Sequence, residues 1–213
     1  MARDHLQVRL PALEPATADD VEEDGVLDAR ELVGADLTGA PARGLRVMES
    51  RIADCRLDDA DLRGARLGDC VLEGLSASAL GLADSTWRDV VVSGSRMGAL
   101  VAHGSTLDRV RIEGTRIDFL NLRGAALTDV RLEDCRIDEL DLGRARLRRV
   151  VLAGCTVGRL AVAGARHTAV HLGGSAIGEV DTVAGLAGAT ISRAQLTDLA
   201  PALAGHVGIV LDD

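Results

Sequence analysis

Apolar residues recur at every fifth position along most of this chain. The series runs from Leu27 to Ile177, and His167 is its only member that is not apolar. Five residues correspond to a rotation of ~140° in a helix, and five steps along a strand invert the side chain, so the period matches neither element. A chain that turns a corner every five residues would keep all these side chains pointing inward. The period therefore predicts a coil with one inward residue per side.

The number of sides follows from the column two residues before each inward residue. From Leu80 onward this column alternates between large and small side chains, and Leu and Val each return after twenty residues. The large members are Leu80, Val90, Leu100, Val110, Leu120, Val130, Leu140, Val150, Leu160 and Val170. Residues twenty apart therefore stack directly, which predicts a coil with four sides of five residues. About seven to eight coils, stacked at the ~4.8 Å spacing of paired strands, account for the pattern.

Glycine marks alternate corners of this coil. Ten glycines at these corners each lie two residues after an inward residue: Gly44, Gly64, Gly74, Gly94, Gly104, Gly114, Gly124, Gly154, Gly164 and Gly174. A type II turn requires a positive φ at its third residue, which glycine adopts without steric cost. We therefore expect type II turns at these corners and a different turn at the others. Asp54, Asp84, Asp134 and Arg144 interrupt the series, so type II turns are not expected there.

The composition agrees with a narrow core. Hydrophobic residues make up 47% of the 213-residue chain, yet Trp87 and Phe119 are its only aromatic residues. Leu, Val, Ile and Ala must therefore fill the interior. We expect one all-β solenoid over residues 25–198. It is preceded by a leader at residues 1–24 that is rich in Asp and Glu, and the sequence leaves open whether this leader is ordered.

The repeat changes phase near its C-terminal end. It slips at residues 180–183 and resumes for one partial coil with Leu186, Ile191 and Leu196. Ser192 and Gln195 then form a capping-box pattern, which marks the start of a helix. We expect helical segments through about residue 205 with a break near Pro201, and a short strand at residues 209–211. Residues 199–213 are accordingly assigned to a helical and strand cap.

Charge and composition exclude several classes of protein. Every basic residue is Arg, and the formal net charge of -9 disfavours direct binding of nucleic acid. The first residues lack the apolar run of a secretory signal, and no later stretch is long and apolar enough to span a membrane. We therefore expect a cytoplasmic protein. In that compartment Cys55, Cys70, Cys135 and Cys155, which lack metal-site spacing, are expected to be reduced thiols.

Several five-residue units resemble the A-(D/N)-L-x-x unit of the pentapeptide-repeat family. They include Ala35-Asp36-Leu37-Thr38-Gly39, Ala60-Asp61-Leu62-Arg63-Gly64 and Leu120-Asn121-Leu122-Arg123-Gly124. The resemblance covers roughly residues 25–198. It implies a right-handed quadrilateral β-helix, and the handedness is implied by the family and not by the periodicity.

The resemblance also implies a function. Members of this family that confer quinolone resistance, or that protect producers of gyrase-poisoning antibiotics, act as DNA-like rods bound by type II topoisomerases and commonly dimerise through C-terminal helices. The implied function is a non-enzymatic, DNA-mimicking modulator or protector of DNA gyrase. The alternative is a protein interaction scaffold unrelated to topoisomerases. It is favoured because the repeat region holds equal numbers of acidic residues and arginines over residues 35–179.

Two charged groups are candidate partner surfaces. The acidic group is Asp54, Asp58, Asp59, Asp61 and Asp69, and the basic group is Arg144, Arg146, Arg148 and Arg149, with Arg159 and Arg166 nearby. For both, the alternative is an ordinary solvated surface. A further outward column, Arg56, Arg96, Arg116 and Arg136, is interleaved with Asp58, Asp118 and Asp138. We interpret this column as a solvated ladder of ion pairs.

No residues converge into a catalytic, cofactor or metal site. His167 and His171 have the spacing of metal ligands on a helix, but in this register His167 points inward and His171 outward, so we expect a satisfied core histidine. Cys135 and Cys155 stack one coil apart with parallel side chains. They are expected to be buried thiols rather than a disulfide.

The last apolar stripe is Leu196, Leu199, Leu203 and Val207, which recur at three- and four-residue spacings. One interpretation is a cap that folds over the last coil, because the ends of a solenoid need covering. The other is a twofold contact, since Ala200, Ala202, Ile209, Val210 and Leu211 add further apolar surface. We expect a homodimer through the C-terminus.

Overall fold

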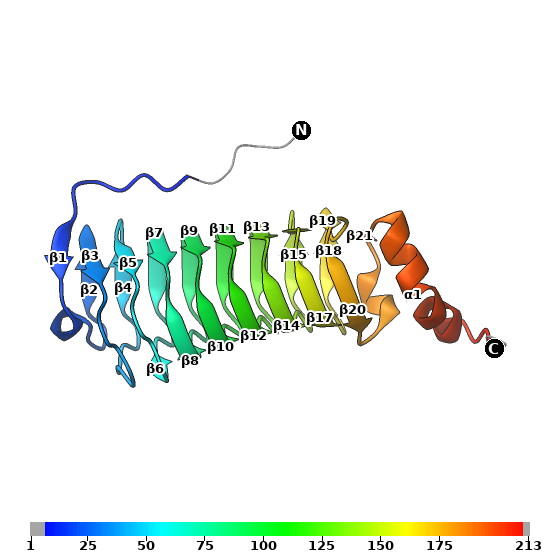
Figure 1. The fold of residues 1–213 in the computed structure, drawn as a ribbon, viewed down its shortest axis with the longest axis horizontal. Helices are drawn as coiled ribbons and strands as arrows, with labels where there is room; N and C mark the ends of the chain where they lie inside the picture. The colour runs from blue at the N-terminus through cyan, green and yellow to red at the C-terminus, as the bar shows by residue number, and fades with distance from the viewer. Residues whose placement is uncertain (1–6, 211–213) are drawn as a thin grey trace.

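The computed structural model describes residues 7–210. It is a parallel β-solenoid of about nine turns that ends in one helix. The strands stack side by side along a rod, with the helix at its C-terminal end (Figure 1). The predicted all-β solenoid with a helical cap is confirmed. The turns exceed the expected seven to eight because strand pairing begins at Glu14 and continues to Thr190.

The strands form two parallel sheets that wrap around the coil. The larger sheet contains β1 (Glu14–Ala16), β2 (Val26–Asp28), β3 (Arg30–Val33), β4 (Arg46–Met48), β5 (Arg51–Ala53), β7 (Arg66–Glu73), β9 (Thr86–Ser93), β11 (Thr106–Glu113), β13 (Ala126–Glu133), β15 (Arg146–Arg148), β16 (Val151–Ala153), β18 (Arg166–Thr168), β19 (Val170–His171) and β21 (Ala189–Thr190). The smaller sheet contains β6 (Ala60–Asp61), β8 (Ser76–Gly81), β10 (Arg96–Val101), β12 (Arg116–Asn121), β14 (Arg136–Asp141), β17 (Thr156–Ala161) and β20 (Ala176–Val180).

The twenty-residue register predicted from the side-chain columns is confirmed. Leu100 pairs with Leu120 between β10 and β12, and Val110 pairs with Val130 between β11 and β13. The phase slip is also present, because Val170 pairs with Ala189, one residue earlier than the register requires. At the other end β1 pairs with β3, so the parallel ladder begins inside the segment that the sequence assigned to an acidic leader.

The inward residues form one continuous core. Every member of the five-residue series from Leu27 to Val162 is buried. Trp87 is accommodated in this narrow space with 2% of its surface exposed, because its neighbour two residues earlier is the small Ser85. The Trp87 indole N–H donates to Ser85 Oγ at 2.7 Å, and Ser85 Oγ donates to the Leu82 carbonyl at 2.6 Å. The one large aromatic side chain of the core is therefore also satisfied in its hydrogen bonding.

The corners differ from the expectation. At one corner the carbonyl of the inward residue accepts a hydrogen bond from the amide three residues later, as from Ser85 to Leu82 and from Ala145 to Leu142. These turns hold Asp84 and Arg144 at positive φ at their third residue, as a type II turn does, so the expectation that type II turns would be absent is wrong at these two positions. At the opposite corner Asp54 and Asp134 also have positive φ. The strand ladders on both sides of a corner impose its backbone geometry, and Asp tolerates the left-handed region better than most residues.

A third corner carries positive φ without any glycine, which the sequence pattern did not indicate. Its members are Ala29, Glu49, Asp69, Asp89, Arg109, Asp129, Arg149 and Ala169, with φ between 47° and 55°. An L residue in the left-handed region costs about 1–2 kcal/mol, whereas glycine does not. This corner therefore stores backbone strain in every coil.

Replacing Ala169 by glycine is consequently expected to stabilise the protein. Ala169 has a φ of 55° and is exposed, so relief of strain should outweigh the greater flexibility of glycine in the unfolded chain, for a net gain of roughly 0.5–1 kcal/mol. Denaturant titration followed by the fluorescence of Trp87 measures the change. The matched control is Ala126→Gly in β13, which has no positive φ and should be destabilised. A loss of stability at position 169 would contradict the strain.

Two side chains form hydrogen bonds with backbone groups of the last coil that have no further coil to pair with. In the regular coils the Leu142 amide donates to the Ala161 carbonyl of the next coil, but the Val162 and Ala163 amides donate instead to the Asp181 carboxylate at 2.9 and 3.2 Å. Gln195 is buried, with 5% of its surface exposed, and it donates the hydrogen bonds that a following coil would otherwise donate. Its side-chain amide donates to the carbonyls of Leu172 at 2.8 Å and Ser175 at 2.7 Å. The cap therefore replaces the backbone of an absent coil with side chains.

The capping elements are η1 (Ala18–Asp20), η2 (Val183–Leu186) and α1 (Arg193–His206). The predicted capping box is confirmed, because Ser192 Oγ accepts from the Gln195 amide and Gln195 Oε1 accepts from the Ser192 amide. The expected break at Pro201 is wrong, since α1 continues through it. Pro201 has no N–H to donate to the carbonyl four residues earlier. Because the helix is exposed there, water can bind that carbonyl instead. Ile209 and Val210 form no strand, and Leu211 lies outside the described residues.

Candidate interaction surface

The interior of the solenoid is filled, so the chemistry of this molecule lies on its outer surface. The buried side chains from Leu27 to Leu172 form one hydrophobic cluster. Among the described residues no three His, Cys, Asp or Glu side chains gather as metal ligands do. In the same part of the chain, no helix has both the length and the apolar character needed to cross a membrane.

One flat face of the rod, which we call the arginine face, presents two outward columns of stacked residues. The first column is Arg46, Arg66, Thr86, Thr106, Ala126, Arg146 and Arg166. The second is Met48, Gly68, Arg88, Asp108, Thr128, Arg148 and Thr168. Strand alternation explains the arrangement, because the residues on either side of each inward side chain point outward. In the first column arginine occupies the two ends with small side chains between, whereas the second column carries Arg88 and Asp108 in its middle.

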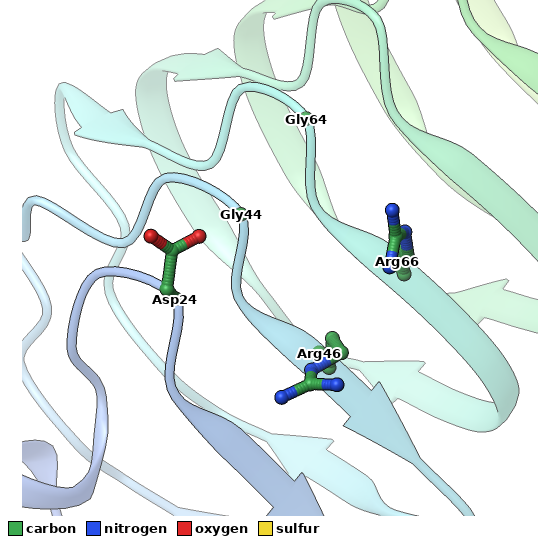
Figure 2. Close-up of a pocket in the computed structure, with 5 residues that line it drawn as sticks. All are labelled: Asp24, Gly44, Arg46, Gly64 and Arg66. Carbon is green, nitrogen blue, oxygen red and sulfur yellow. The ribbon is translucent and has the colours of Figure 1, made fainter.

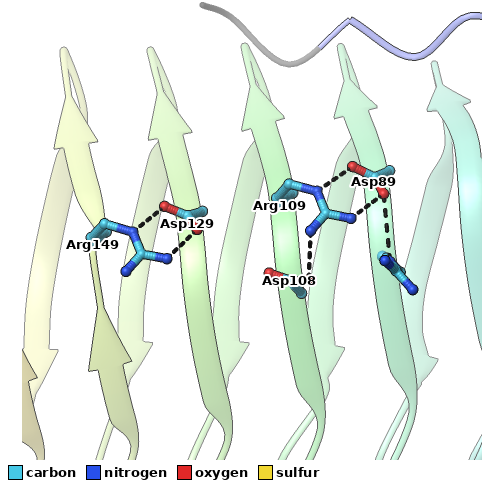
Figure 3. Close-up of polar contacts among 6 residues, drawn as sticks. Asp89, Asp108, Arg109, Asp129 and Arg149 are labelled. Carbon is cyan, nitrogen blue, oxygen red and sulfur yellow. Dashed lines mark hydrogen bonds and ion pairs between the residues drawn. The ribbon is translucent and has the colours of Figure 1, made fainter. Parts of the chain in front are cut away.

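A row of ion pairs runs along the corner beside the arginine face. Arg109 forms a two-pronged contact with Asp89 and also binds Asp108 at 2.8 Å, while Arg149 forms a two-pronged contact with Asp129 (Figure 3). The Arg109–Asp89 and Arg149–Asp129 pairs each join residues twenty apart, so they link neighbouring coils. The Arg149 guanidinium lowers the pKa of the Asp129 carboxyl through its hydrogen bonds. Arg149, a predicted member of the basic group, is therefore neutralised.

The other arginines at the C-terminal end of this face are not neutralised. Arg146 and Arg148 alternate on β15, Arg144 lies at the turn before that strand, and Arg166 on β18 pairs directly with Arg146. We call these four the arginine cluster. Within residues 7–210, no carboxylate lies within 4.0 Å of any of the four guanidinium groups. Arg159 belongs to the other sheet and lies 3.8 Å from Glu139.

At the N-terminal end of the same column, Arg46 and Arg66 line a shallow hollow. Gly44, Gly64 and Asp24 complete its lining (Figure 2). The Asp24 carboxylate lies in the space that a Cβ on Gly44 would occupy. Asp24 lines the same hollow, but within residues 7–210 no carboxylate lies within 4.0 Å of the Arg46 or Arg66 guanidinium group.

The five aspartates of the predicted acidic group are not brought together. Asp54, Asp59 and Asp69 occupy three different corners of the coil, each at positive φ. Asp58 accepts a hydrogen bond from the Ser78 amide at 2.5 Å. Asp61 binds Arg43 and Arg63, both at 2.7 Å, and the Arg63 hydrogen bond lowers the pKa of the Asp61 carboxyl. These carboxylates encircle the coil rather than forming one surface.

The outward column on the smaller sheet forms the expected ladder of ion pairs. Arg116 lies 3.3 Å from Asp118 and 3.7 Å from Asp138, and Arg136 lies 3.6 Å from Asp138. These groups are about half exposed, so solvent screens each contact and its contribution to stability is small. Arg96, which stacks on Arg116 in the same column, has no carboxylate within 4.0 Å among residues 7–210, so the ladder is incomplete at its N-terminal end.

His167 occupies the inward position on β18, paired with Leu147, whereas His171 is exposed. The two histidines therefore point in different directions, as the register predicts. The expectation that His167 would be a satisfied core histidine is wrong. Both of its ring nitrogens are buried and lack a hydrogen-bond partner within residues 7–210. At the last regular coil, His167 occupies the inward position that leucine holds in the two preceding coils, and its ring makes no polar contact there.

Replacing His167 by leucine is expected to stabilise the fold by about 1–2 kcal/mol, because it removes two unsatisfied polar atoms from the core. Leu127 and Leu147 already occupy this inward column in the two preceding coils. The measurement is the free energy of unfolding in denaturant. The exposed His171→Leu variant serves as a control and should be nearly neutral. A destabilised His167→Leu protein would imply that the imidazole has a partner in solution.

All four cysteines are free and buried, as expected. The thiols of Cys135 and Cys155 contact backbone carbonyls in their own and the preceding coil, at 3.3 to 3.5 Å. Burial raises the pKa of the Cys70 thiol to about 11. These cysteines act as small core residues that bridge coils, and the raised pKa of Cys70 keeps its thiol in the protonated form, which is a poor nucleophile.

The predicted C-terminal stripe is divided by the structure. Leu199 is buried at 6% exposure and packs toward the solenoid, whereas Leu196 is 51% exposed and Val207 is 69% exposed. Leu203 is half-buried. The helix thus covers the last coil through a small part of its surface, chiefly Gln195 and Leu199, and leaves an apolar side open.

Comparison with known proteins gives a family match to part of the chain. Residues 115–154 match the model of pentapeptide repeats, with eight copies. No curated protein matches the sequence significantly. Among solved structures, a trypsin-treated form of QnrB1, a plasmid-mediated fluoroquinolone resistance protein, is 18% identical, with 89% of this chain and 100% of that chain covered and a TM-score of 0.44.

A second solved structure is HetL, a pentapeptide repeat protein involved in heterocyst differentiation regulation from the cyanobacterium Nostoc sp. strain PCC 7120. It is 19% identical, with 73% of this chain and 84% of that chain covered and a TM-score of 0.36. The twenty-residue register joins the coils on either side to the matched segment. The resemblance to the pentapeptide-repeat family is thereby confirmed, and residues 115–154 are pentapeptide repeats of that family.

Proposed function

We propose that this protein is a non-enzymatic binding rod that docks partner proteins along its flat charged faces. The observation that carries the proposal is the filled aliphatic interior, from Leu27 to Leu172, which leaves chemically varied side chains only on the outside. Flat parallel faces with rows of charge at a regular spacing suit recognition of a surface rather than turnover of a small molecule.

Affinity capture with the full-length protein tests this function. The captured proteins are quantified by mass spectrometry against an unrelated protein of similar charge as control. We expect a defined set of partners whose capture falls at high salt, because the faces are charged. Capture of the same proteins by the control, in the same amounts, would refute the binding function.

The finer candidate is a DNA-mimicking modulator or protector of DNA gyrase. It is supported by the row of carboxylates at Glu49, Asp69 and Asp89, which recur at one per coil along a single corner. A regular row of negative charge is the feature by which a protein rod imitates a DNA backbone. The ion pair of Asp89 with Arg109 limits the length of this row.

A supercoiling assay with purified gyrase, with and without a fluoroquinolone, tests the finer candidate. We expect inhibition of supercoiling, or protection from the drug, at micromolar protein. The matched variant is Glu49→Arg with Asp69→Arg, because Arg109 and Arg149 show that this corner accepts arginine at positive φ. Neither inhibition nor protection by the wild-type protein would refute the gyrase role and leave a rod with other partners.

A C-terminal homodimer is part of the proposal. It is supported by exposed apolar side chains at the C-terminal end, which are Leu196 on α1 and Val207, Ile209 and Val210 after the helix. Light scattering is the test. The variant Leu196→Glu changes an exposed position and should convert a dimer to a monomer without loss of the fold. A wild-type protein that is monomeric at tens of micromolar would refute the dimer.

A further inference from the structure

We propose that the arginine cluster binds a short acidic segment of a partner protein. The inference rests on the proposed function as a binding rod and adds to it a site and a ligand chemistry. The cluster consists of Arg144, Arg146, Arg148 and Arg166 at the C-terminal end of the arginine face.

The first argument is the stacking of like charges. Arg146 and Arg166 are directly opposed on neighbouring parallel strands, and both are exposed. Like charges at opposed positions destabilise a sheet. No acidic residue occurs between Asp141 and Glu179, so the surrounding chain supplies nothing to offset the repulsion. An anionic ligand that bridges the two guanidinium groups would remove this repulsion.

The second argument is the contrast with the other arginines that stack along the rod. Arg109 and Arg149 each bind an aspartate of the preceding coil, and Arg116 and Arg136 lie beside Asp118 and Asp138. These stacked arginines have acid on their own strand or one coil away. Arg46 and Arg66 also stack without a carboxylate within 4.0 Å in residues 7–210, but the arginine cluster gathers four guanidinium groups without such an acid, which marks it as a surface whose counter-charge comes from outside.

The third argument is the geometry of the guanidinium groups. Arg146 and Arg148 leave β15 on the same side, about two residues apart along the strand, and Arg166 lies about 4.8 Å away on the next strand. Each guanidinium can bind a carboxylate through two parallel N–H bonds. A peptide with several Asp or Glu residues can therefore engage three or four of these groups at once.

The limits of the cluster favour an acidic peptide over nucleic acid. Toward the N-terminus the second column of the face carries Asp108 two coils before Arg148, and the adjoining corner carries Asp89 and Asp129. A nucleic acid long enough to gain affinity from many phosphates would run from the cluster onto these acids, and the whole chain carries a net charge of -9. A short acidic segment contacts the arginines alone.

Fluorescence anisotropy with a labelled octaglutamate peptide tests the site on the full-length protein. The test variant is Arg146→Thr with Arg166→Thr, because Thr86 and Thr106 already occupy that column. The matched control is Arg116→Thr with Arg136→Thr, because Thr156 occupies the equivalent column on the smaller sheet. Both pairs stack one coil apart, and both variants lose two positive charges.

We expect the wild-type protein to bind the peptide more weakly as salt increases, and the Arg146/Arg166 variant to lose at least ~10-fold in affinity. The control should lose less than ~3-fold. No binding to the wild-type protein, or an equal loss in both variants, would overturn the proposal. So would tighter binding of a labelled single-stranded or duplex DNA of equal charge.

The same variants separate this proposal from the broader function. If the Arg146/Arg166 variant captures every partner of the wild-type protein in equal amounts, the rod binds proteins through another face and the cluster is not the site. The variant should be at least as resistant to denaturant as the wild-type protein, because the repulsion between the two arginines is gone. A variant of wild-type stability that still binds the peptide fully would also refute the site.

Discussion

Replacing Leu122 by aspartate is expected to unfold the solenoid or to cause its aggregation. Leu122 is an inward residue with 2% of its surface exposed, stacked between Ala102 and Leu142 of the neighbouring coils. A carboxylate there would be buried among aliphatic side chains without a partner, at a cost on the order of 4–5 kcal/mol or more. That is a large part of the total stability of a typical domain. Thermal denaturation followed by circular dichroism measures the effect.

The control for this experiment is the adjacent change Asn121→Asp. Position 121 is outward, and in the same column Asp61 and Asp141 accept hydrogen bonds from the amide two residues later, as Asn121 does from Arg123. The control should cost at most about 1 kcal/mol, because the new carboxylate would lie opposite Asp141 on the next strand but remain partly exposed. Wild-type stability in Leu122→Asp would mean that Leu122 is not inward in solution.

Replacing Gln195 by glutamate is expected to detach the C-terminal helix. The glutamate could still accept from the Ser192 amide, but it would lose the N–H groups that bind the Leu172 and Ser175 carbonyls. A buried carboxylate would then face two carbonyl oxygens, at a cost of about 3 kcal/mol. Because the contacts of α1 with the solenoid are few, we expect local release of the helix rather than global unfolding.

Hydrogen exchange of the peptides that cover residues 189–206 measures this release. Protection in α1 should fall in Gln195→Glu, while the central coils keep their protection. Since the folded state disfavours the charged form, the pKa of the introduced carboxyl should be higher in the folded than in the unfolded chain. The penalty should accordingly shrink as the pH falls. The control Ser192→Ala removes one capping contact and should cost only about 1 kcal/mol. Unchanged protection at neutral pH would contradict the role of Gln195.

The periodic part of this protein could be predicted from its sequence because every coil has the same requirement for apolar residues at fixed positions. One inward apolar residue per five positions, as at Leu122, is enough to define the side of a coil, and the alternating Leu120 and Val130 columns define its four sides. Both patterns act through the burial of apolar surface, which depends on residue type and spacing alone. The capping box of Ser192 and Gln195 was predictable for the same reason, since its contacts join residues three apart.

The acidic candidates could not be grouped correctly from the sequence. Asp54 and Asp69 are close in the chain, but the coil places them on different corners, and Asp61 is neutralised by Arg43 and Arg63. The sequence spacing gives the side of the coil on which a residue lies. It does not give the reach of a flexible arginine from a neighbouring coil, and that reach decides which charges remain free.

The coil, its period, its inward residues and the start of the final helix could all be predicted from the chain, because they depend on the local spacing of residues. Three other features become apparent only in the folded structure. These are the positive φ of Arg109 and its corner, the unsatisfied ring of His167, and the capping of the last coil by Asp181 and Gln195. Each depends on groups about twenty residues away meeting across coils, where the ladder imposes backbone geometry and leaves particular polar atoms with or without partners.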